Sequence, residues 1–298
     1  MYTKLLVPLD GSRLSECILP YARFLARGLG IPVELLQVID WDDYPAILTA
    51  QLGREIESTK TDLNKNTRDY LESVATSFVN SSTVICSVER GNPAEVILDR
   101  ATDQSGTLIA MSTHGRSGLQ RWVLGSTADK VLQAATNPVL LVRATKQRVT
   151  NKEVALKQVL VPLDGSGLAE QVLPHVTVLA KMMMLEVVLL RVYDVPENMP
   201  QLQKITRIVK DAAKTYLEDK IRRLRSEELK KVSYLLLKGN AANRIVKIAQ
   251  AATPDNLVAM CTHGRSGTRR WVLGSVTDRV VRHCNEPVLV IRAAAASE

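Results

Sequence analysis

A glycine-rich segment that occurs twice in the chain is the strongest candidate for chemistry. Thr113–Gly118 reads Thr-His-Gly-Arg-Ser-Gly, and Thr262–Gly267 repeats it residue for residue. Each copy follows an apolar, strand-like run and leads to Gly-Ser at the start of a helical pattern. Glycines let the backbone come close to a ligand, and the free amides and dipole of a helix N-terminus favour an anion. The segment is therefore typical of a polyphosphate-binding loop, held by amides and the Ser126 hydroxyl.

A purely structural interpretation of the same loop stays open. Ser126 and Asp129 have the Ser-x-x-Asp spacing of a capping box, in which the serine hydroxyl satisfies its own helix. On that interpretation the glycines only turn the chain. The duplication shows that the two copies share an origin, but it does not by itself show that either copy kept a ligand.

Asp10 and Asp164 are the second candidate feature, since each follows Val-Pro-Leu at the end of the first apolar run of its copy. In a parallel sheet both carboxylates would lie at the edge where ligands bind. There an aspartate can hold a ribose hydroxyl, or a Mg²⁺ ion that is bound to phosphate. The alternative is that each aspartate caps the following helix, a position that Asp fills well. The two roles are compatible.

His114 and His263 invite a catalytic interpretation, but neither has an obvious partner nearby in sequence, so packing in the loop is favoured over a general base. Trp122 and Trp271 are interpreted as packing residues rather than base-stacking ones. The 4 histidines and 4 cysteines show no metal-ligand spacing. The sequence contains no Gly-x4-Gly-Lys-[Ser/Thr] loop, and we predict no catalytic residue.

The elements that must position these residues are duplicated as well. Leu5–Ser12 returns as Val159–Ser166, and a polar stretch between the copies predicts domains at residues 1–145 and 157–298 with a linker at 146–156. Apolar runs alternate with helical patterns, which indicates a parallel sheet covered on both faces. We therefore predict an α/β fold of two tandem Rossmann-like, doubly wound domains, each a five-stranded parallel sheet flanked by helices. In the first copy the strands are expected at Lys4–Leu9, Val33–Ile39, Val84–Val88, Thr107–Ser112 and Pro138–Arg143, and a helix from about Thr127 to Ala135.

The net charge of +8 is carried by the second copy. Residues 1–150 hold 16 Lys and Arg against 16 Asp and Glu, whereas residues 151–298 hold 23 against 15. Much of the excess lies in Lys204–Lys231, whose apolar helical stripe indicates that its charges form a solvated face. That segment offers only Tyr216 for base stacking, so nucleic acid is not expected as a partner.

No apolar run approaches the ~20 residues of a membrane span, and no long apolar signal precedes the first strand, so we expect a cytoplasmic protein and no membrane partner.

With these motifs the chain resembles the universal stress protein family in its tandem two-domain form, over nearly its whole length. The family pattern Gly-x2-Gly-x9-Gly-[Ser/Thr] is similar to the segment from Gly115 to Ser126 and to its second copy, but Ser112 and Cys261 stand at the first glycine, where a Cβ can crowd a ribose or phosphate. The nucleotide-binding residues that the resemblance implies are Pro8, Asp10, Val38, Ser112, Gly115, Arg116, Gly118, Gly125, Ser126 and Thr127 in the first copy, and Pro162, Asp164, Val192, Cys261, Gly264, Arg265, Gly267, Gly274, Ser275 and Val276 in the second.

The resemblance implies a cytoplasmic, ATP-binding regulatory protein of the stress response, a binder rather than an efficient catalyst. ATP is the expected ligand, with ADP and AMP as alternatives, and Mg²⁺ would be bound through the phosphates beside Asp10 and Asp164. The two copies are expected to pair within the chain through their last strands, and a homodimer of two chains stays open. Two other functions remain open, namely a weak ATP-hydrolysing or phosphotransfer enzyme and a ligand-free scaffold that acts through protein or nucleic-acid partners.

Overall fold

The chain divides into two compact units, Tyr2–Glu153 and Val154–Glu298, here named the first half and the second half. The computed structural model describes residues 2–40, 53–79, 83–114, 124–144, 153–195, 201–251, 256–263 and 273–293. The predicted linker at 146–156 lies largely outside these ranges, and its limits stay a prediction. The pairing of the two halves likewise stays a prediction.

The first half is built on a parallel sheet with the strand order β3-β2-β1-β4-β5. Leu5 of the first strand lies opposite Val33, and Ile109 of the fourth lies opposite Val139. The strands are β1 (Lys4–Pro8), β2 (Val33–Ile39), β3 (Val84–Arg90), β4 (Thr107–Ser112) and β5 (Val139–Val142), and the helices are η1 (Ser15–Ile18), α1 (Leu19–Leu29), α3 (Gly53–Ala75), α4 (Pro93–Thr102) and α5 (Ser126–Ala134).

The second half repeats this plan with the strand order β8-β7-β6-β9-β10. Val159 lies opposite Val187, and Val258 lies opposite Val288, so the register is also repeated. The strands are β6 (Gln158–Pro162), β7 (Glu186–Tyr193), β8 (Val232–Lys238), β9 (Asn256–Cys261) and β10 (Val288–Ile291), and the helices are α6 (Gly167–Glu170), α7 (Leu173–Met183), α8 (Leu202–Ser226), α9 (Ala241–Ala251) and α10 (Ser275–His283).

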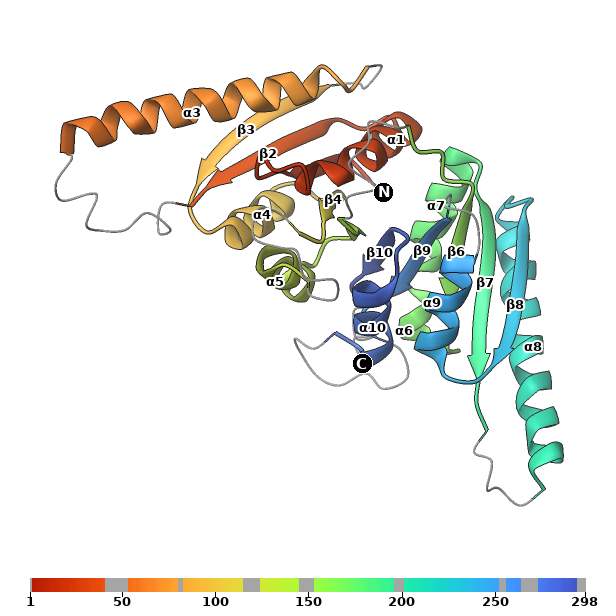
Figure 1. Cartoon of the computed structure of the whole chain (residues 1–298). Helices are drawn as coiled ribbons and strands as arrows, with labels where there is room; N and C mark the ends of the chain where they lie inside the picture. Colours follow the sequence, from red (N-terminus) through yellow and green to blue (C-terminus); the bar gives the residue numbers. More distant parts are fainter. Residues whose placement is uncertain are drawn as a thin grey trace. The chain divides into compact units, whose positions relative to one another are not determined.

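Each half is a doubly wound α/β domain, as predicted. The chain runs from β1 outward through β2 to β3, and then crosses back to β4 and β5. Because such crossovers are right-handed, the helices before β3 and those after it cover opposite faces, and Figure 1 shows α3 and α4 on opposite sides of the first sheet. The strand order therefore reverses between β1 and β4, and between β6 and β9. In open α/β sheets this reversal opens a crevice at the carboxyl ends of the strands, where ligands bind.

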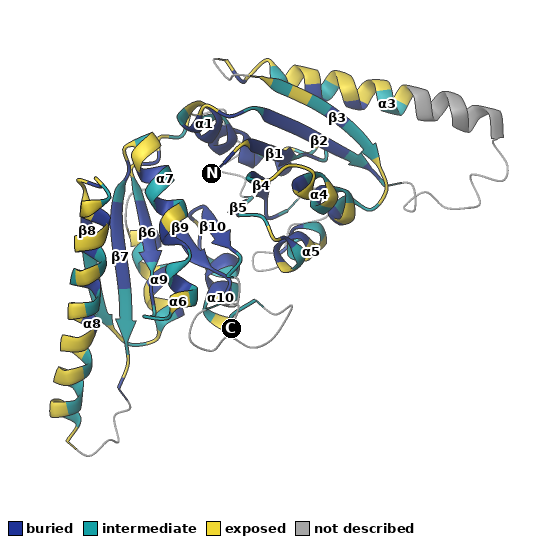
Figure 2. Ribbon diagram, turned by 180° about the vertical axis from the view of Figure 1, so that it is seen from behind, coloured by how far each residue is buried: buried dark blue, intermediate teal, exposed yellow. Residues whose placement is uncertain are grey.

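The core of each half lies between its sheet and its helices. Every residue of β4 and of β9 is buried, and Figure 2 shows the central strands of both sheets as buried while the outer sides of the helices are exposed. Near-continuous apolar strands are what a parallel sheet covered on both faces requires. None of the described helices combines the length and apolar character that crossing a membrane requires.

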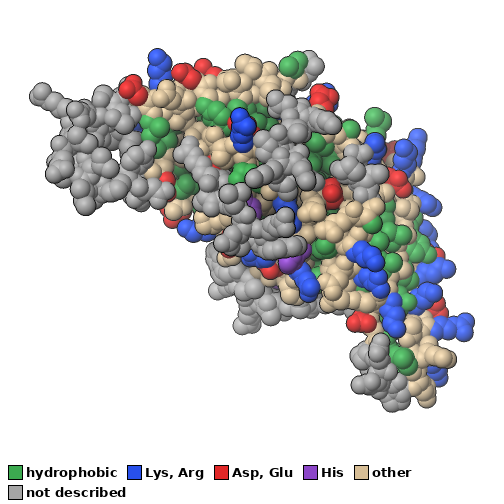
Figure 3. Space-filling model, in the orientation of Figure 1, with side chains coloured by type: hydrophobic (Ala, Val, Ile, Leu, Met, Phe, Trp, Pro, Cys, Tyr) green, Lys and Arg blue, Asp and Glu red, His purple; other side chains and the backbone are tan. Residues whose placement is uncertain are grey.

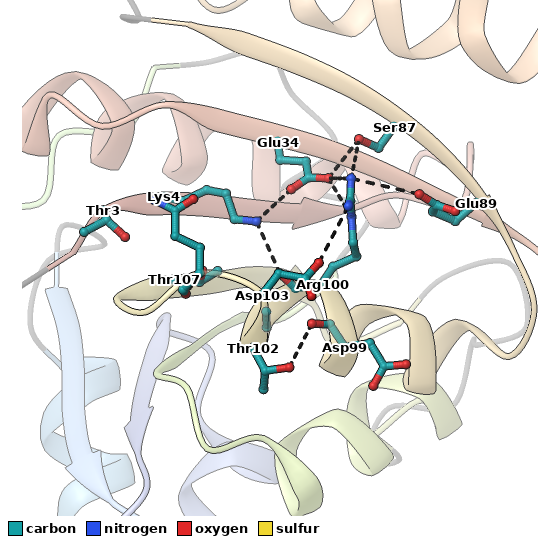
Figure 4. Close-up of polar contacts among 12 residues, drawn as sticks. Thr3, Lys4, Glu34, Ser87, Glu89, Asp99, Arg100, Thr102, Asp103 and Thr107 are labelled. Carbon is teal, nitrogen blue, oxygen red and sulfur yellow. Dashed lines mark hydrogen bonds and ion pairs between the residues drawn. The ribbon is translucent and has the colours of Figure 1, made fainter.

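One polar cluster interrupts the apolar core of the first half. The carboxylate of Glu34, which is 4% exposed, accepts hydrogen bonds from Lys4 Nζ at 2.9 Å, Arg100 Nη2 at 2.7 Å and Ser87 Oγ at 2.8 Å (Figure 4). Burial by itself raises the pKa of Glu34, but the hydrogen bonds from Lys4 and Ser87 and the two positive charges outweigh it, so the pKa is lowered. The equivalent positions of the second half hold Gln158, Val188, Leu235 and Ile248.

Candidate functional site

A cavity of about 390 Å³ lies at the carboxyl ends of β1, β2 and β4, where α4 and α5 begin. This is the place that the reversal of strand order favours for a ligand. The predicted site residues of the first half that the structure describes all line it; they are Pro8, Asp10, Val38, Ser112, Gly125, Ser126 and Thr127. Residues far apart in the sequence are thus brought to one place.

A cavity of about 200 Å³ occupies the equivalent place in the second half. It too is lined by all of the predicted residues that the structure describes there, which are Pro162, Asp164, Val192, Cys261, Gly274, Ser275 and Val276. The remaining predicted residues lie outside the described part of the chain, and they are Gly115, Arg116, Gly118, Gly264, Arg265 and Gly267. Trp122 and Trp271 also lie outside it.

The helix that faces each cavity begins without a side-chain cap. Gly125 is the N-cap of α5, Gly274 is the N-cap of α10, and neither helix start has a side-chain hydrogen bond. Ser126 is therefore the first helical residue, and the capping-box interpretation of Ser126 and Asp129 is wrong. The first amides of a helix have no partners within the helix, so those of α5 and α10 remain suited to an anion.

Gly125 and Gly274 are required by a close approach between two backbone segments. The amide of Gly125 donates to the carbonyl oxygen of Thr113 at 2.9 Å, and that of Gly274 donates to Thr262 at 2.8 Å. A Cβ on Gly125 would lie 3.0 Å from the Thr113 oxygen, and one on Gly274 would lie 2.7 Å from the Thr262 oxygen. These contacts hold the start of α5 against the end of β4 and the start of α10 against the end of β9.

Each aspartate at the end of the first strand accepts hydrogen bonds from the turn that follows it. Asp10 Oδ1 accepts from the Ser12 amide at 2.9 Å. Asp164 Oδ1 accepts from the Ser166 amide at 3.0 Å and from its hydroxyl at 2.7 Å. The N-cap of α6 is Ser166 itself, and that of η1 is Leu14. The interpretation of the aspartates as helix caps is therefore wrong, and both carboxylates face a cavity.

The two residues at the first position of the glycine pattern behave differently. The Ser112 hydroxyl donates to the carbonyl oxygen of His114 and accepts from its amide, so it is held within its own turn. The Cys261 thiol, 3.7 Å from the carbonyl oxygen of Ala169, is directed toward α6 instead. Burial raises the pKa of the Cys261 thiol to about 12, so the thiol is neutral near pH 7 and is not a nucleophile.

Both loop histidines are held by the threonine that precedes them. His114 Nδ1 and His263 Nδ1 each lie 3.1 Å from the hydroxyl of that neighbour. The same hydroxyls accept from the amides of Ala144 and Ala293, just beyond the last strand of each half. In catalytic triads a carboxylate orients the histidine at Nδ1, and the contact described at Nδ1 of these two histidines is with a threonine hydroxyl. No cluster of three metal-binding side chains occurs among the described residues.

Sequence reasoning missed several residues that line the first cavity, among them Ser15, Asp40, Asn92 and Lys130. Asn92 is the N-cap of α4 and accepts from the amides of Ala94 and Glu95. Lys130 lies one turn after Ser126, so the two share a helix face, and it brings a positive charge to the cavity. That spacing was a usable signal, whereas nothing local marked Asp40 or Asn92 as neighbours of Ser126.

The basic helix of the second half carries its charge mostly in ion pairs. Figure 3 shows Lys and Arg side chains gathered along α8. The pairs with acidic neighbours include Arg207 with Asp211 and Lys214 with Glu218, while Lys220 bonds Glu170 at 2.8 Å. Such pairs fit the interpretation of a solvated helix face.

Comparisons with known proteins point to one family. The profile of the universal stress protein family matches residues 1–143 and again residues 155–292. A universal stress protein of Mycolicibacterium smegmatis is 23% identical over 296 residues, which cover 97% of this chain and 96% of that protein. A universal stress protein of Methanocaldococcus jannaschii is 31% identical over 149 residues, covering 48% of this chain and 86% of that protein.

A solved structure shows the same fold over the whole length. The crystal structure of a universal stress protein from Archaeoglobus fulgidus superimposes with a TM-score of 0.66 at 19% identity, and the match covers 98% of both chains. The fold is therefore shared with that protein.

Proposed function

Because this chain belongs to the universal stress protein family, in its tandem two-domain form, we propose that it is a cytoplasmic adenine-nucleotide-binding regulatory protein of the stress response. ATP is the proposed ligand, with ADP or AMP as alternatives, and Mg²⁺ enters with the phosphates. All four cysteines are free thiols, which agrees with a reducing compartment.

The observation that carries the proposal is the convergence on one cavity of three features from separate elements. In the first half these are the uncapped start of α5, the carboxylate of Asp10 after β1, and Val38 on β2. The helix start suits the phosphates, the carboxylate suits a ribose hydroxyl, and the apolar strand residue suits the base. Lys130 adds a positive charge beside Ser126, and Asp10 can also contact a Mg²⁺ ion held by the phosphates.

The site supports binding better than catalysis. The described contact of His114 Nδ1 is with the Thr113 hydroxyl, and the Cys261 thiol is neutral. Phosphoryl transfer nevertheless depends largely on positioning and on charge neutralisation, so slow hydrolysis is the second candidate, favoured by the single observation that Asp10 and Lys130 line the same cavity. If it occurs, turnover disappears in the Asp10→Ala, Asp164→Ala double variant; turnover that persists in that variant contradicts the hydrolysis candidate.

Calorimetric titration tests the proposal directly. The full chain, purified and stripped of nucleotide, is titrated with ATP in the presence of Mg²⁺, and the material before stripping is analysed by mass spectrometry. Saturable heat and a co-purified adenine nucleotide are expected. No heat at high protein concentration, together with no co-purified nucleotide, contradicts the proposal.

A further inference from the structure

The two cavities occupy equivalent places in their halves but differ in size. The first-half cavity measures about 390 Å³ and the second-half cavity about 200 Å³. Sites that enclose a cofactor-sized ligand measure about 300–1,000 Å³. The first-half cavity is within that range, whereas the second-half cavity is below it.

The walls of the two cavities differ in polarity, mostly in one direction. The exception is the pair Ala128 and Thr277, where the hydroxyl is in the second half and donates to the carbonyl oxygen of Cys261. Three hydroxyl side chains that line the first cavity have less polar counterparts at the same positions of the second. These pairs, with the first-half residue named first, are Ser15 and Ala169, Ser112 and Cys261, and Thr127 and Val276. The second cavity is thus both smaller and more apolar, and a ligand rich in hydroxyls and phosphate oxygens loses hydrogen-bond partners there.

The glycine-rich loops do not differ in sequence between the two halves. Thr113–Gly118 and Thr262–Gly267 have identical sequences. Just beyond them the second half has Arg269 where the first half has Gln120, so the second loop carries more positive charge and not less. Among the described residues, the differences between the two sites lie in the strands and helices that form the walls.

Cys261 is the wall residue with the clearest effect. It stands at the last position of β9, is 4% exposed, and directs its sulfur toward the carbonyl oxygen of Ala169 on α6. The hydroxyl of Thr277 donates to the carbonyl oxygen of Cys261 at 2.8 Å, which ties the start of α10 to the same residue. The thiol thus lies between the strand end and α6, whereas the Ser112 hydroxyl is held in its own turn by the backbone of His114. Since the thiol stays protonated, its effect comes from where it packs and not from reactivity.

We propose that only the first half binds a nucleoside polyphosphate, and that Cys261, packed against Ala169, is the residue that closes the second-half site. This inference rests on the proposed function, because it assigns the nucleotide to one of the two cavities. One chain then carries one nucleotide, in spite of its two copies of the loop.

The stoichiometry of ATP binding tests the assignment. Titration of the stripped full chain with ATP and Mg²⁺ should give one site per chain, and Asp10→Ala should weaken that site at least tenfold. Asp211→Asn, on the exposed face of α8, is the matched control and should leave the affinity unchanged. Two sites of similar affinity, or one site that survives Asp10→Ala, overturn the inference while leaving the proposed function intact. Complete absence of binding contradicts the proposed function itself, so the two failures are distinguishable.

Exchange of wall residues tests the role of Cys261. The combined variant Ala169→Ser, Cys261→Ser, Val276→Thr should bind a second ATP, and the reverse change Ser112→Cys should weaken the first site at least tenfold. Thermal unfolding establishes that each variant is folded, and Cys261→Ser alone replaces the combined variant if that one does not fold. A folded variant that still binds one ATP, together with an unchanged affinity of Ser112→Cys, overturns the assignment of Cys261.

Discussion

The amide of Gly125 donates a hydrogen bond to the carbonyl oxygen of Thr113, with 2.9 Å between nitrogen and oxygen. This contact places the first turn of α5 against the end of β4, and the second half repeats it between Gly274 and Thr262. It explains why a glycine precedes the serine in both copies, since any side chain there meets the backbone of the neighbouring strand.

Replacing either glycine by alanine should therefore destabilise its half. A Cβ would lie 3.0 Å from the Thr113 oxygen in Gly125→Ala and 2.7 Å from the Thr262 oxygen in Gly274→Ala, so the second variant should lose more stability. Overpacking of this kind costs about 1–3 kcal/mol. Urea unfolding measures both, and Gly167→Ala, where a Cβ meets nothing within 4 Å, is the control. Equal and negligible losses would contradict the steric explanation.

The serines at the two helix starts should separate binding from stability. Ser166 caps α6 and accepts from the amide of Ala169, so Ser166→Ala should cost about 1 kcal/mol of stability. Ser126 has no such bond, so Ser126→Ala should leave the free energy of unfolding nearly unchanged while weakening ATP binding. Denaturation and calorimetry on both variants check this. A large stability loss in Ser126→Ala would restore the capping-box interpretation.

Replacing Met184 by glycine should stabilise the second half. It ends α7 in the left-handed conformation with φ 56° and ψ 36°, where the equivalent Gly30 ends α1 with φ 65° and ψ 31°. The left-handed conformation costs a residue with a Cβ about 1–2 kcal/mol, and the Met184 side chain is 85% exposed, so little packing is lost. Met184→Gly should raise the stability by about 1 kcal/mol, and Gly30→Met should lower it, as measured by chemical unfolding. A destabilised Met184→Gly would show that the methionine side chain packs usefully.

The polar cluster around Glu34 should make the first half sensitive to single substitutions. Glu34→Val leaves the buried Lys4 ammonium without its carboxylate, and breaking a buried pair in this way costs about 3–5 kcal/mol. Exchange of all four residues for their second-half counterparts, Lys4→Gln, Glu34→Val, Ser87→Leu and Arg100→Ile, should be close to neutral. Chemical denaturation of both variants, compared with the wild type, measures these two losses of stability. If the fourfold variant is as unstable as Glu34→Val, the charged cluster contributes more to the free energy of unfolding than the residues that replace it.

The same cluster predicts a dependence of stability on pH. The pKa of Glu34 is lower in the folded chain than its ordinary value, so the cluster stabilises the folded state above that ordinary value of about 4.3. This contribution is lost as the pH falls through the lower pKa of the folded state. Stability measured between about pH 6 and pH 3 should fall less steeply in the fourfold variant than in the wild type. If stability falls equally steeply with pH in both proteins, the pH dependence does not come from Glu34.

Periodicity and the repeat were sufficient to predict the fold. Val33–Ile39 and Thr107–Ser112 were expected as strands and are β2 and β4 with those bounds. The expected strand at Pro138–Arg143 loses its first and last residues, since β5 spans Val139–Val142. Apolar runs between turn signals carry this information locally, so a single sequence is enough.

The site was predicted less completely, because its chemistry depends on contacts between distant segments. The helix expected from Thr127 begins at Ser126, and that one residue decides whether the serine hydroxyl caps the helix or faces a cavity. Asn92 joins the site only because α4 begins beside β4 in space. The pattern marked Cys261 as a side chain at the first glycine, but it did not reveal that the thiol is directed toward Ala169 of α6.

The cluster of Glu34, Lys4 and Arg100 has a consequence for how the whole chain unfolds in acid. One half carries this charged cluster in its interior, and the other has the uncharged residues Val188, Gln158 and Ile248 at the same positions. Acid thus disrupts an ion-paired cluster that the second half lacks. A protein of two such halves is not expected to unfold on acidification as one cooperative unit with one midpoint. It should lose its first half while its second half is still intact, so that the two copies of one ancestral domain differ in what they tolerate.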